Sequence, residues 1–311
     1  MKKLMTLALA AGMLLGAATG ASAIDFKAKG QWLMGFSAGD GSLVSHVKDN
    51  KASNHNKAAD TDDIFGASQR VRLQLDAVAS EALSGTVYFE IGDTHWGKND
   101  DGGAMGADQR IVELKNAYID WMVPNTDLKF RMGIQGIQLP NVAGGSAVFD
   151  DDVAGVVASY QFNENVGLTT FWARPYNDNY TGTDRVNYHD NMDLFALMVP
   201  LTFDGVKVTP WAMYGMAGAN TNGLTSTAPY ARYANGGDAF AFDPSSTSKA
   251  YGSMFWAGLP ISLTLWDPLN VELDINYGYV ESMGRYAAER ADNSFTRMGD
   301  TKREGWLVKA L

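Results

Sequence analysis

The sequence predicts an all-β fold, an antiparallel β-barrel that crosses a membrane with its strands. Three observations lead to this prediction. Hydrophobic and polar residues alternate in segment after segment, the connections between these segments are short and long in turn, and aromatic residues recur near the segment ends. Alternation with a period of two is the pattern of a strand that has one apolar and one polar face.

The N-terminus has the pattern of a secretory signal peptide. Lys2 and Lys3 precede an apolar run, and residues 21–23 (Ala-Ser-Ala) fit a small-residue cleavage site. The apolar run is too short to span a membrane as a helix. We therefore expect residues 1–23 to be cleaved off and residues 24–311 to form one transmembrane barrel domain.

The alternating segments predict about twelve strands. In one of them, Val71 and Leu73 alternate with Arg70 and Arg72, so that hydrophobic and basic side chains point to opposite faces. The predicted strands are 25–36, 66–80, 85–96, 110–121, 127–137, 152–162, 166–175, 190–203, 206–216, 250–266, 271–282 and 303–311.

The connections separate a membrane barrel from a soluble β-sandwich, which also has one apolar face per strand. Short turns and long polar loops alternate strictly, which is typical of outer-membrane barrels. The aromatic residues near strand ends fit the girdles of such barrels; they are Trp96, Trp121, Phe162, Trp172, Phe203 and Trp266. The short turns lie at 81–84, 124–126, 163–165, 204–205 and 267–270, and the long loops at 37–65, 97–109, 138–151, 176–189, 217–249 and 283–302.

Composition removes several classes of function. The formal net charge is −10, whereas proteins that bind nucleic acids through the phosphate backbone carry an excess of Lys and Arg. The absence of cysteine excludes thiolate metal sites and cysteine nucleophiles. The sequence has no G-x-S-x-G or H-E-x-x-H motif and no readable Ser-His-Asp arrangement. We therefore expect no catalysis, no cofactor, no metal and no nucleic-acid partner.

Four segments carry a resemblance to a known family. IDFKAKGQW (24–32), QRVRLQLD (69–76), AYIDWMVP (117–124) and VFDDDVAG (148–155) resemble the outer-membrane homotrimeric porin family of sulfate-reducing bacteria. The resemblance covers nearly all of the chain after the signal peptide. It implies a homotrimer of general porin-like barrels in the outer membrane of a Gram-negative cell, in contact with lipid and lipopolysaccharide.

The C-terminus departs from this family, whose members are longer. Barrels of this type generally end on an aromatic residue, whereas this sequence stops at Leu311 within a predicted strand. We therefore expect a C-terminal part to be missing and the complete barrel to have about sixteen strands.

The resemblance also implies where the pore would be narrowest. In general trimeric porins the third long loop folds inward, and its acids face basic residues of the wall. The corresponding acids here are Asp150, Asp151 and Asp152. The basic wall candidates share the polar face of their predicted strands; they are Arg70, Arg72, Lys129, Arg131, Lys27 and Lys29.

Opposed charges across a narrow polar constriction orient water and solute dipoles and raise the barrier for apolar solutes. Alternatively, the basic side chains only solvate a polar wall and pair with nearby Asp and Glu. Exposure of them to lipid is disfavoured, because an Arg at the bilayer midplane costs about 2–4 kcal/mol.

The expected function is passive diffusion of small polar solutes and ions through a water-filled channel. One alternative is a substrate-selective porin in which Tyr and Trp side chains form a binding track. Another is a structural or adhesive barrel whose loops bind a partner. The residues leave the identity of the solute and the sign of the ion selectivity open.

Overall fold

The computed structural model describes eleven stretches of the chain, which are 24–40, 63–100, 102–106, 112–142, 144–177, 191–218, 251–266, 268–281, 285–289, 295–300 and 302–311. The predicted signal peptide lies outside the described residues. Within these stretches, no helix has both the length and the apolar character needed to cross a membrane.

The described chain is all-β, and fourteen of its strands belong to one sheet. These strands are β1 (Asp25–Asp40), β2 (Asp63–Ser80), β3 (Leu83–His95), β4 (Glu113–Met122), β5 (Leu128–Gln138), β6 (Asp150–Gln161), β7 (Gly167–Asn177), β8 (Asn191–Met198), β9 (Leu201–Phe203), β10 (Val206–Val208), β11 (Trp211–Gly218), β12 (Tyr251–Trp266), β13 (Leu269–Val280) and β16 (Arg303–Ala310). A separate hairpin pairs β14 (Arg285–Glu289) with β15 (Phe295–Asp300).

The observed strands confirm the predicted all-β chain, with two corrections. The predicted strands 190–203 and 206–216 are each broken in two, near Pro200 and Pro210. Proline has no N–H for the ladder, which favours a break at each of these two positions. The hairpin of β14 and β15 lies within the connection 283–302, which the alternation pattern predicted to be a loop.

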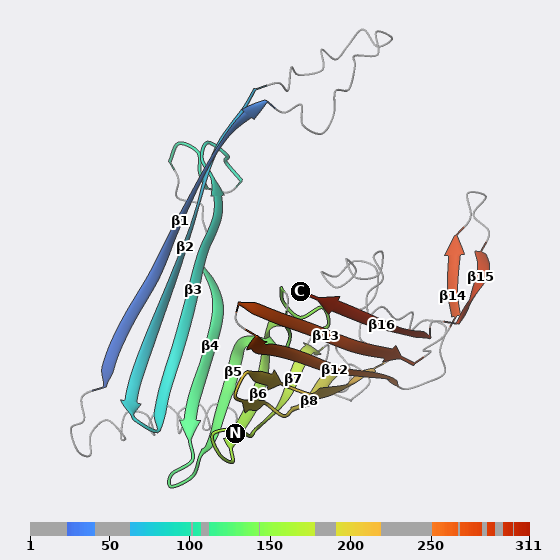
Figure 1. The fold of residues 1–311 in the computed structure, drawn as a ribbon. Coiled ribbons are helices and arrows are strands. Elements are labelled where there is room, and N and C mark those ends of the chain that lie inside the picture. Colours follow the sequence, from blue (N-terminus) through green and yellow to red (C-terminus); the bar gives the residue numbers. More distant parts are fainter. Residues whose placement is uncertain are drawn as a thin grey trace, which may run out of the picture. The chain divides into compact units, whose positions relative to one another are not determined.

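The chain divides into two compact units, with the boundary inside β4. The first unit contains β1, β2 and β3 (Figure 1). Its strands β1 and β2 pair antiparallel over their full length, from Asp25 opposite Val78 to Asp40 opposite Asp63. Lys27 and Lys29 consequently share one face with Arg70, Arg72 and the other even-numbered residues of β2.

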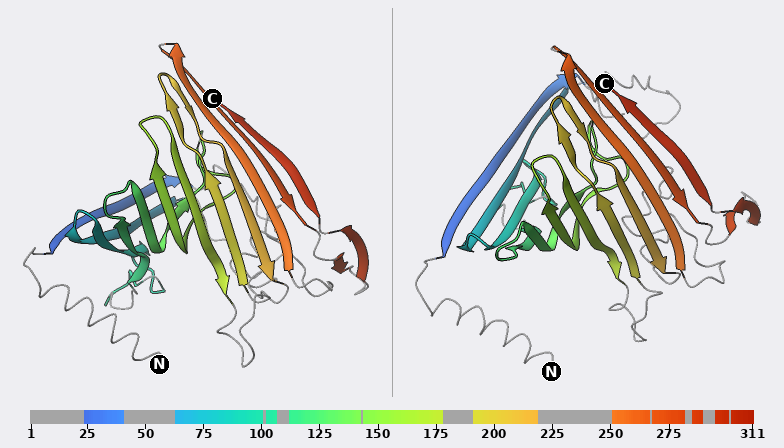
Figure 2. Two further views of the ribbon diagram at one scale, coloured as in Figure 1. Left: turned by 90° about the horizontal axis from the view of Figure 1, so that it is seen from below. Right: turned by 60° about the horizontal axis from the view of Figure 1, so that its bottom comes forward.

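The second unit contains β5–β13 and β16, which run side by side in Figure 2. Antiparallel pairing follows the order β5, β6, β7, β8, β11, β12, β13 and β16. The short strands β9 and β10 pair with each other, and β10 also pairs with β12. In the register between β5 and β6, Arg131 lies opposite Val157 and Met132 opposite Val156.

Short turns join the strands where the sequence predicts them, at 81–82 and 204–205 among others. Asn125 and Gly205 have positive φ values of 59° and 67°, which a tight turn demands and which Asn and Gly tolerate best. The Asn163 side chain accepts hydrogen bonds from the backbone N–H groups of Asn165 and Val166 and so closes another turn.

Candidate functional site

Basic and acidic side chains form an ion-pair cluster on one face of β2 and β3. Arg70 donates from Nε to Asp93 Oδ1 at 2.9 Å, and its Nη2 forms a second bond to Asp93 Oδ2. Arg72 Nε donates to Glu90 Oε2 at 2.6 Å. Glycine at position 92 leaves space for the cluster, because a Cβ there would lie 3.2 Å from both Arg70 Cγ and Glu90 Cγ.

A second cluster lies in the other unit, on β4 and β5. Arg131 donates from Nε and Nη2 to the two carboxylate oxygens of Asp120, at 2.7 and 2.8 Å. Lys129 Nζ lies 3.3 Å from Asp120 Oδ2. The Arg131 guanidinium carbon is 4.2 Å from the centre of the Tyr118 ring, a cation–π contact that further fixes it. Two positive charges thus share one carboxylate.

The two lysines of β1 are more loosely held. Lys27 forms an ion pair of 3.5 Å with Asp25, and both side chains are nearly two-thirds exposed. In the β1–β2 register, Lys27 lies opposite Asp76 and Lys29 opposite Gln74. Exposed pairs of this kind contribute little to stability. All six predicted basic residues therefore lie on the charged faces of their strands, and at least five of them have acidic partners.

The acids predicted for the constriction lie in a strand rather than in the third loop. Asp150, Asp151 and Asp152 form the start of strand β6. Because side chains alternate along a strand, only Asp151 points to the same face as Arg131. Asp150 lies opposite Gln138 on the other face and accepts a 2.6 Å hydrogen bond from the Gln138 side chain.

The third loop itself, residues 139–149, packs against the sheet of the second unit. Leu139 is fully buried, and the Phe149 ring stacks on Phe171 of β7 with the ring centres 6.2 Å apart. Lys309 of β16 donates from Nζ to the carbonyl of Gly145 at 2.8 Å. The loop is thus attached to two strands, β7 and β16, that both follow it in the sequence.

Inside the loop, side chains accept the hydrogen bonds of backbone N–H groups that have no partner strand. The Asn141 carboxamide accepts from the N–H of Gly145, and Ser146 Oγ accepts from the N–H groups of Val148 and Phe149. Gly144 and Gly145 have φ values of 92° and 93°, a region that disfavours other residues. The loop is therefore a compact structure of its own.

The loop covers an apolar cluster that lies on the same face as Arg131. Alternation along β5 to β13 places every strand residue of this cluster on that face. The cluster consists of Ile137, Leu139, Val153, Phe171, Ala173, Met192, Leu194, Ala196, Met198, Trp211, Met213, Ala217, Met254, Trp256 and Val280. The face that carries the basic residues is consequently charged in one part and apolar beneath the loop.

A cavity of about 410 Å³ lies where these two parts meet. Lys129, Arg131, Ser159 and Thr169 contribute polar atoms to its lining, and Phe171 contributes a ring. The other lining residues are Gln135, Gly136, Ile137, Gln138, Pro140, Val157, Met198 and Pro200. The cavity is thus bounded by strands β5–β8, the start of the third loop and the bend at Pro200.

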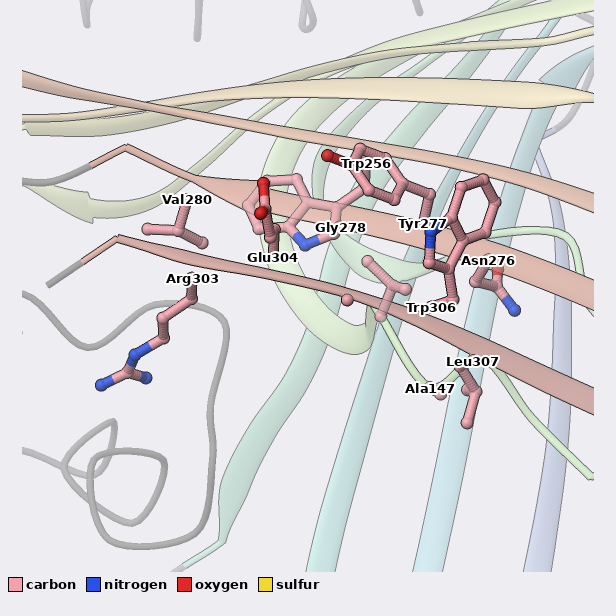
Figure 3. Close-up of a pocket in the computed structure, with 12 residues that line it drawn as sticks. Ala147, Trp256, Asn276, Tyr277, Gly278, Val280, Arg303, Glu304, Trp306 and Leu307 are labelled. Atoms are coloured by element: carbon pink, nitrogen blue, oxygen red, sulfur yellow. The ribbon is translucent and has the colours of Figure 1, made fainter.

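A smaller cavity of about 270 Å³ lies on the other side of the loop, against β12, β13 and β16 (Figure 3). Ala147 and Val148 of the loop line it together with Trp256, Tyr277 and Trp306. Tyr277 and Trp306 are ring partners with centres 4.8 Å apart. The Arg303 side chain points away from these rings in Figure 3.

The opposite face of the sheet is apolar and exposed in both units. In β1, Phe26, Trp32 and Phe36 alternate on this face and are 75%, 69% and 63% exposed. The second unit repeats the pattern; its exposed residues on this face include Met132, Ile134, Trp172, Phe195, Leu197, Phe255 and Leu259. No second sheet covers them among the described residues. In a soluble β-sandwich, by contrast, the apolar face of each sheet is covered by the other sheet.

The prediction from sequence did not include the acidic partners Glu90, Asp93 and Asp120. Each lies in a predicted strand. Glu90 and Asp120 occupy polar positions of the alternating pattern, and this pattern could have identified them as residues of the charged face. It also missed Arg174, which donates to both carboxylate oxygens of Asp193 at 2.9 and 3.0 Å near the end of β7.

No known protein family matches the chain, and no curated protein matches its sequence. Among solved structures, the chain is similar to the NanC porin, with a TM-score of 0.30 and 12% identity over 78% of this chain and 91% of that chain. It is also similar to OmpT, an outer membrane protein of Vibrio cholerae, with a TM-score of 0.28 and 12% identity over 94% and 97% of the two chains. For a trimer form of OmpT the TM-score is 0.19 and the identity 10%, over 94% and 99%. These TM-scores are too low for the likeness to carry an argument.

Proposed function

We propose that the protein is an outer-membrane porin, a β-barrel that lets small polar solutes and ions diffuse through a water-filled lumen. The observation that carries the proposal is the division of the sheet faces. Large hydrophobic side chains are exposed on one face, where the pair Arg174–Asp193 lies near the end of β7, and the pairs Arg72–Glu90 and Arg131–Asp120 lie on the other face. In water, an exposed apolar face of this extent is unfavourable, whereas in a bilayer it contacts lipid tails.

The charged face then lines the lumen. The pairs Arg72–Glu90 and Arg131–Asp120 keep ionised groups at the wall while neutralising most of the local field. The reverse arrangement is unfavourable, because an Arg or Lys that faces lipid at mid-membrane costs about 2–4 kcal/mol. Pairing with acids agrees with the alternative that these residues solvate the wall, and paired side chains can also form part of a constriction.

The third loop is the proposed constriction. Its contacts with Phe171 and Lys309 attach it to the face that we assign to the lumen. A loop held there by a stacked ring and a hydrogen bond to a charged group narrows the path without closing it by itself. Asp151 at the start of β6 is the acid that shares this face with Arg131.

The resemblance of the sequence to homotrimeric porins supports a trimer in the outer membrane of a Gram-negative cell, reached after cleavage near Ala23. Liposome swelling tests the function. Vesicles that contain the refolded protein should swell in isotonic solutions of small sugars, and swelling should slow as the sugar becomes larger. Folded protein that leaves the vesicles impermeable to every sugar and ion contradicts a porin and favours a structural or adhesive barrel.

A further inference from the structure

We propose that the cavity between Arg131 and Phe171 is a binding site for small carboxylates that carry an apolar body, such as aromatic monocarboxylates. The inference deepens the proposed function, since it names a solute class for the same face. Its volume of about 410 Å³ lies within the range of small-molecule sites. The lining combines two cations, Lys129 and Arg131, with apolar side chains.

The cationic side of the cavity has hydrogen-bonding capacity to spare. Arg131 has five N–H groups, and two of them donate to Asp120. Lys129 has three, and its contact with Asp120 uses one. A carboxylate that enters the cavity can therefore accept from both side chains while Asp120 keeps them in place.

The local charge selects anions. Lys129 and Arg131 together carry two positive charges against the one negative charge of Asp120. Among the described residues that line the cavity, none is a carboxylate. The site is thus a local positive region in a protein whose formal net charge is −10. Charge-assisted hydrogen bonds to a carboxylate are shorter and stronger than neutral ones.

The remaining lining selects the body of the ligand. Val157, Pro140 and Pro200 are half-buried and provide an apolar surface next to the cations; the nearly fully buried Phe171 and Met198 complete the apolar lining. A fully hydrophilic anion leaves this surface in contact with water, whereas a ring or a short aliphatic body covers it. The hydroxyls of Ser159 and Thr169 lie between the charged and apolar parts and can donate to the carboxylate or to a ring substituent.

Calorimetric titration of the folded protein in detergent micelles tests the inference with sodium benzoate as the probe. Benzoate should bind saturably, and acetate, which lacks the ring, and benzamide, which lacks the charge, should each bind at least several-fold more weakly. Lys129→Gln should weaken benzoate binding about tenfold, the effect of losing one hydrogen bond to a charged group. Lys207→Gln is the matched control, because Lys207 lies on the same face in β10 but outside the cavity.

Thr169→Glu provides a second variant of different chemistry, since it places a carboxylate into the cavity and should abolish benzoate binding. Equal affinities for benzoate, acetate and benzamide overturn the inference, as does a Lys129→Gln variant that binds like the parent protein. Binding is measured without any current or flux. A protein that conducts ions but does not bind benzoate therefore contradicts this site alone, and one that binds benzoate but does not conduct contradicts the porin.

Discussion

Arg131 and Asp120 are joined by two parallel hydrogen bonds, from Nε to Oδ1 at 2.7 Å and from Nη2 to Oδ2 at 2.8 Å. This two-point geometry fixes the guanidinium in direction as well as in place. Lys129 adds a second cation to the same carboxylate, so the cluster keeps a positive charge. Under the proposed assignment of this face to the lumen, we expect the cluster to act on permeating ions.

Arg131→Gln should shift ion selectivity toward cations. The substitution removes the fixed positive charge and leaves Asp120 to be neutralised by Lys129 alone, so the wall becomes more negative there. The reversal potential in a salt gradient measures the shift. Lys207→Gln removes a charge of the same sign away from the cluster and should have a smaller effect. Identical reversal potentials for Arg131→Gln and the parent protein would place Arg131 away from the ion path.

Phe149→Ala should increase single-channel conductance and its fluctuation. The ring of Phe149 stacks on Phe171 and helps to hold the third loop against the strands. Without it, the loop loses part of its attachment, although Lys309 still donates to the Gly145 carbonyl. Current records of the variant and of the conservative Phe149→Leu check this. An unchanged conductance in Phe149→Ala would argue against the loop as the constriction.

Gly155→Ala should destabilise the protein, whereas Gly305→Ala should not. A Cβ at Gly155 would lie 2.5 Å from the backbone oxygen of Trp172, and backbone in the middle of a sheet cannot move aside easily. The cost of such overpacking is about 1–3 kcal/mol. At Gly305 a Cβ would meet nothing within 4 Å. Urea unfolding of both variants in lipid vesicles measures the difference, and equal midpoints would contradict the close approach of β6 and β7.

Met132→Arg should destabilise the protein in a bilayer by about 2–4 kcal/mol, because the exposed apolar face is assigned to lipid. Met132→Leu keeps the side chain hydrophobic and should be nearly neutral. Folding titrations in lipid vesicles give both free energies of unfolding. If Met132→Arg folds into vesicles as readily as Met132→Leu, the side chain faces water and the assignment of the two faces is reversed.

Local patterns account for what the sequence could predict of the fold. Alternation along β2 and β5 and the turn residues Asn125 and Gly205 are read from a few neighbouring positions. The breaks near Pro200 and Pro210 were missed because β-forming apolar residues lie on both sides of each proline. The hairpin of β14 and β15 was missed because its polar composition resembles that of a loop.

The contacts of the candidate site depend on strand register and tertiary packing, which cannot be read from the sequence alone. Which acid reaches Arg131 is decided by how β4 lies against β5, so Asp120 could not be named from spacing alone. Asp150 and Asp151 were assigned to the loop because the strand begins two residues earlier than the predicted start at Asp152. The apolar cluster around Met213 and Leu194 interrupts the expected polar face because the third loop covers it.

Single-channel recording in a planar bilayer tests the central claim most directly. The account predicts stable current steps that scale with salt concentration, arrive in groups of three if the protein is a trimer, and change selectivity in Arg131→Gln. Protein that is folded and inserted, yet passes no current at any salt concentration or voltage, would contradict the assignment of the charged face to a water-filled lumen.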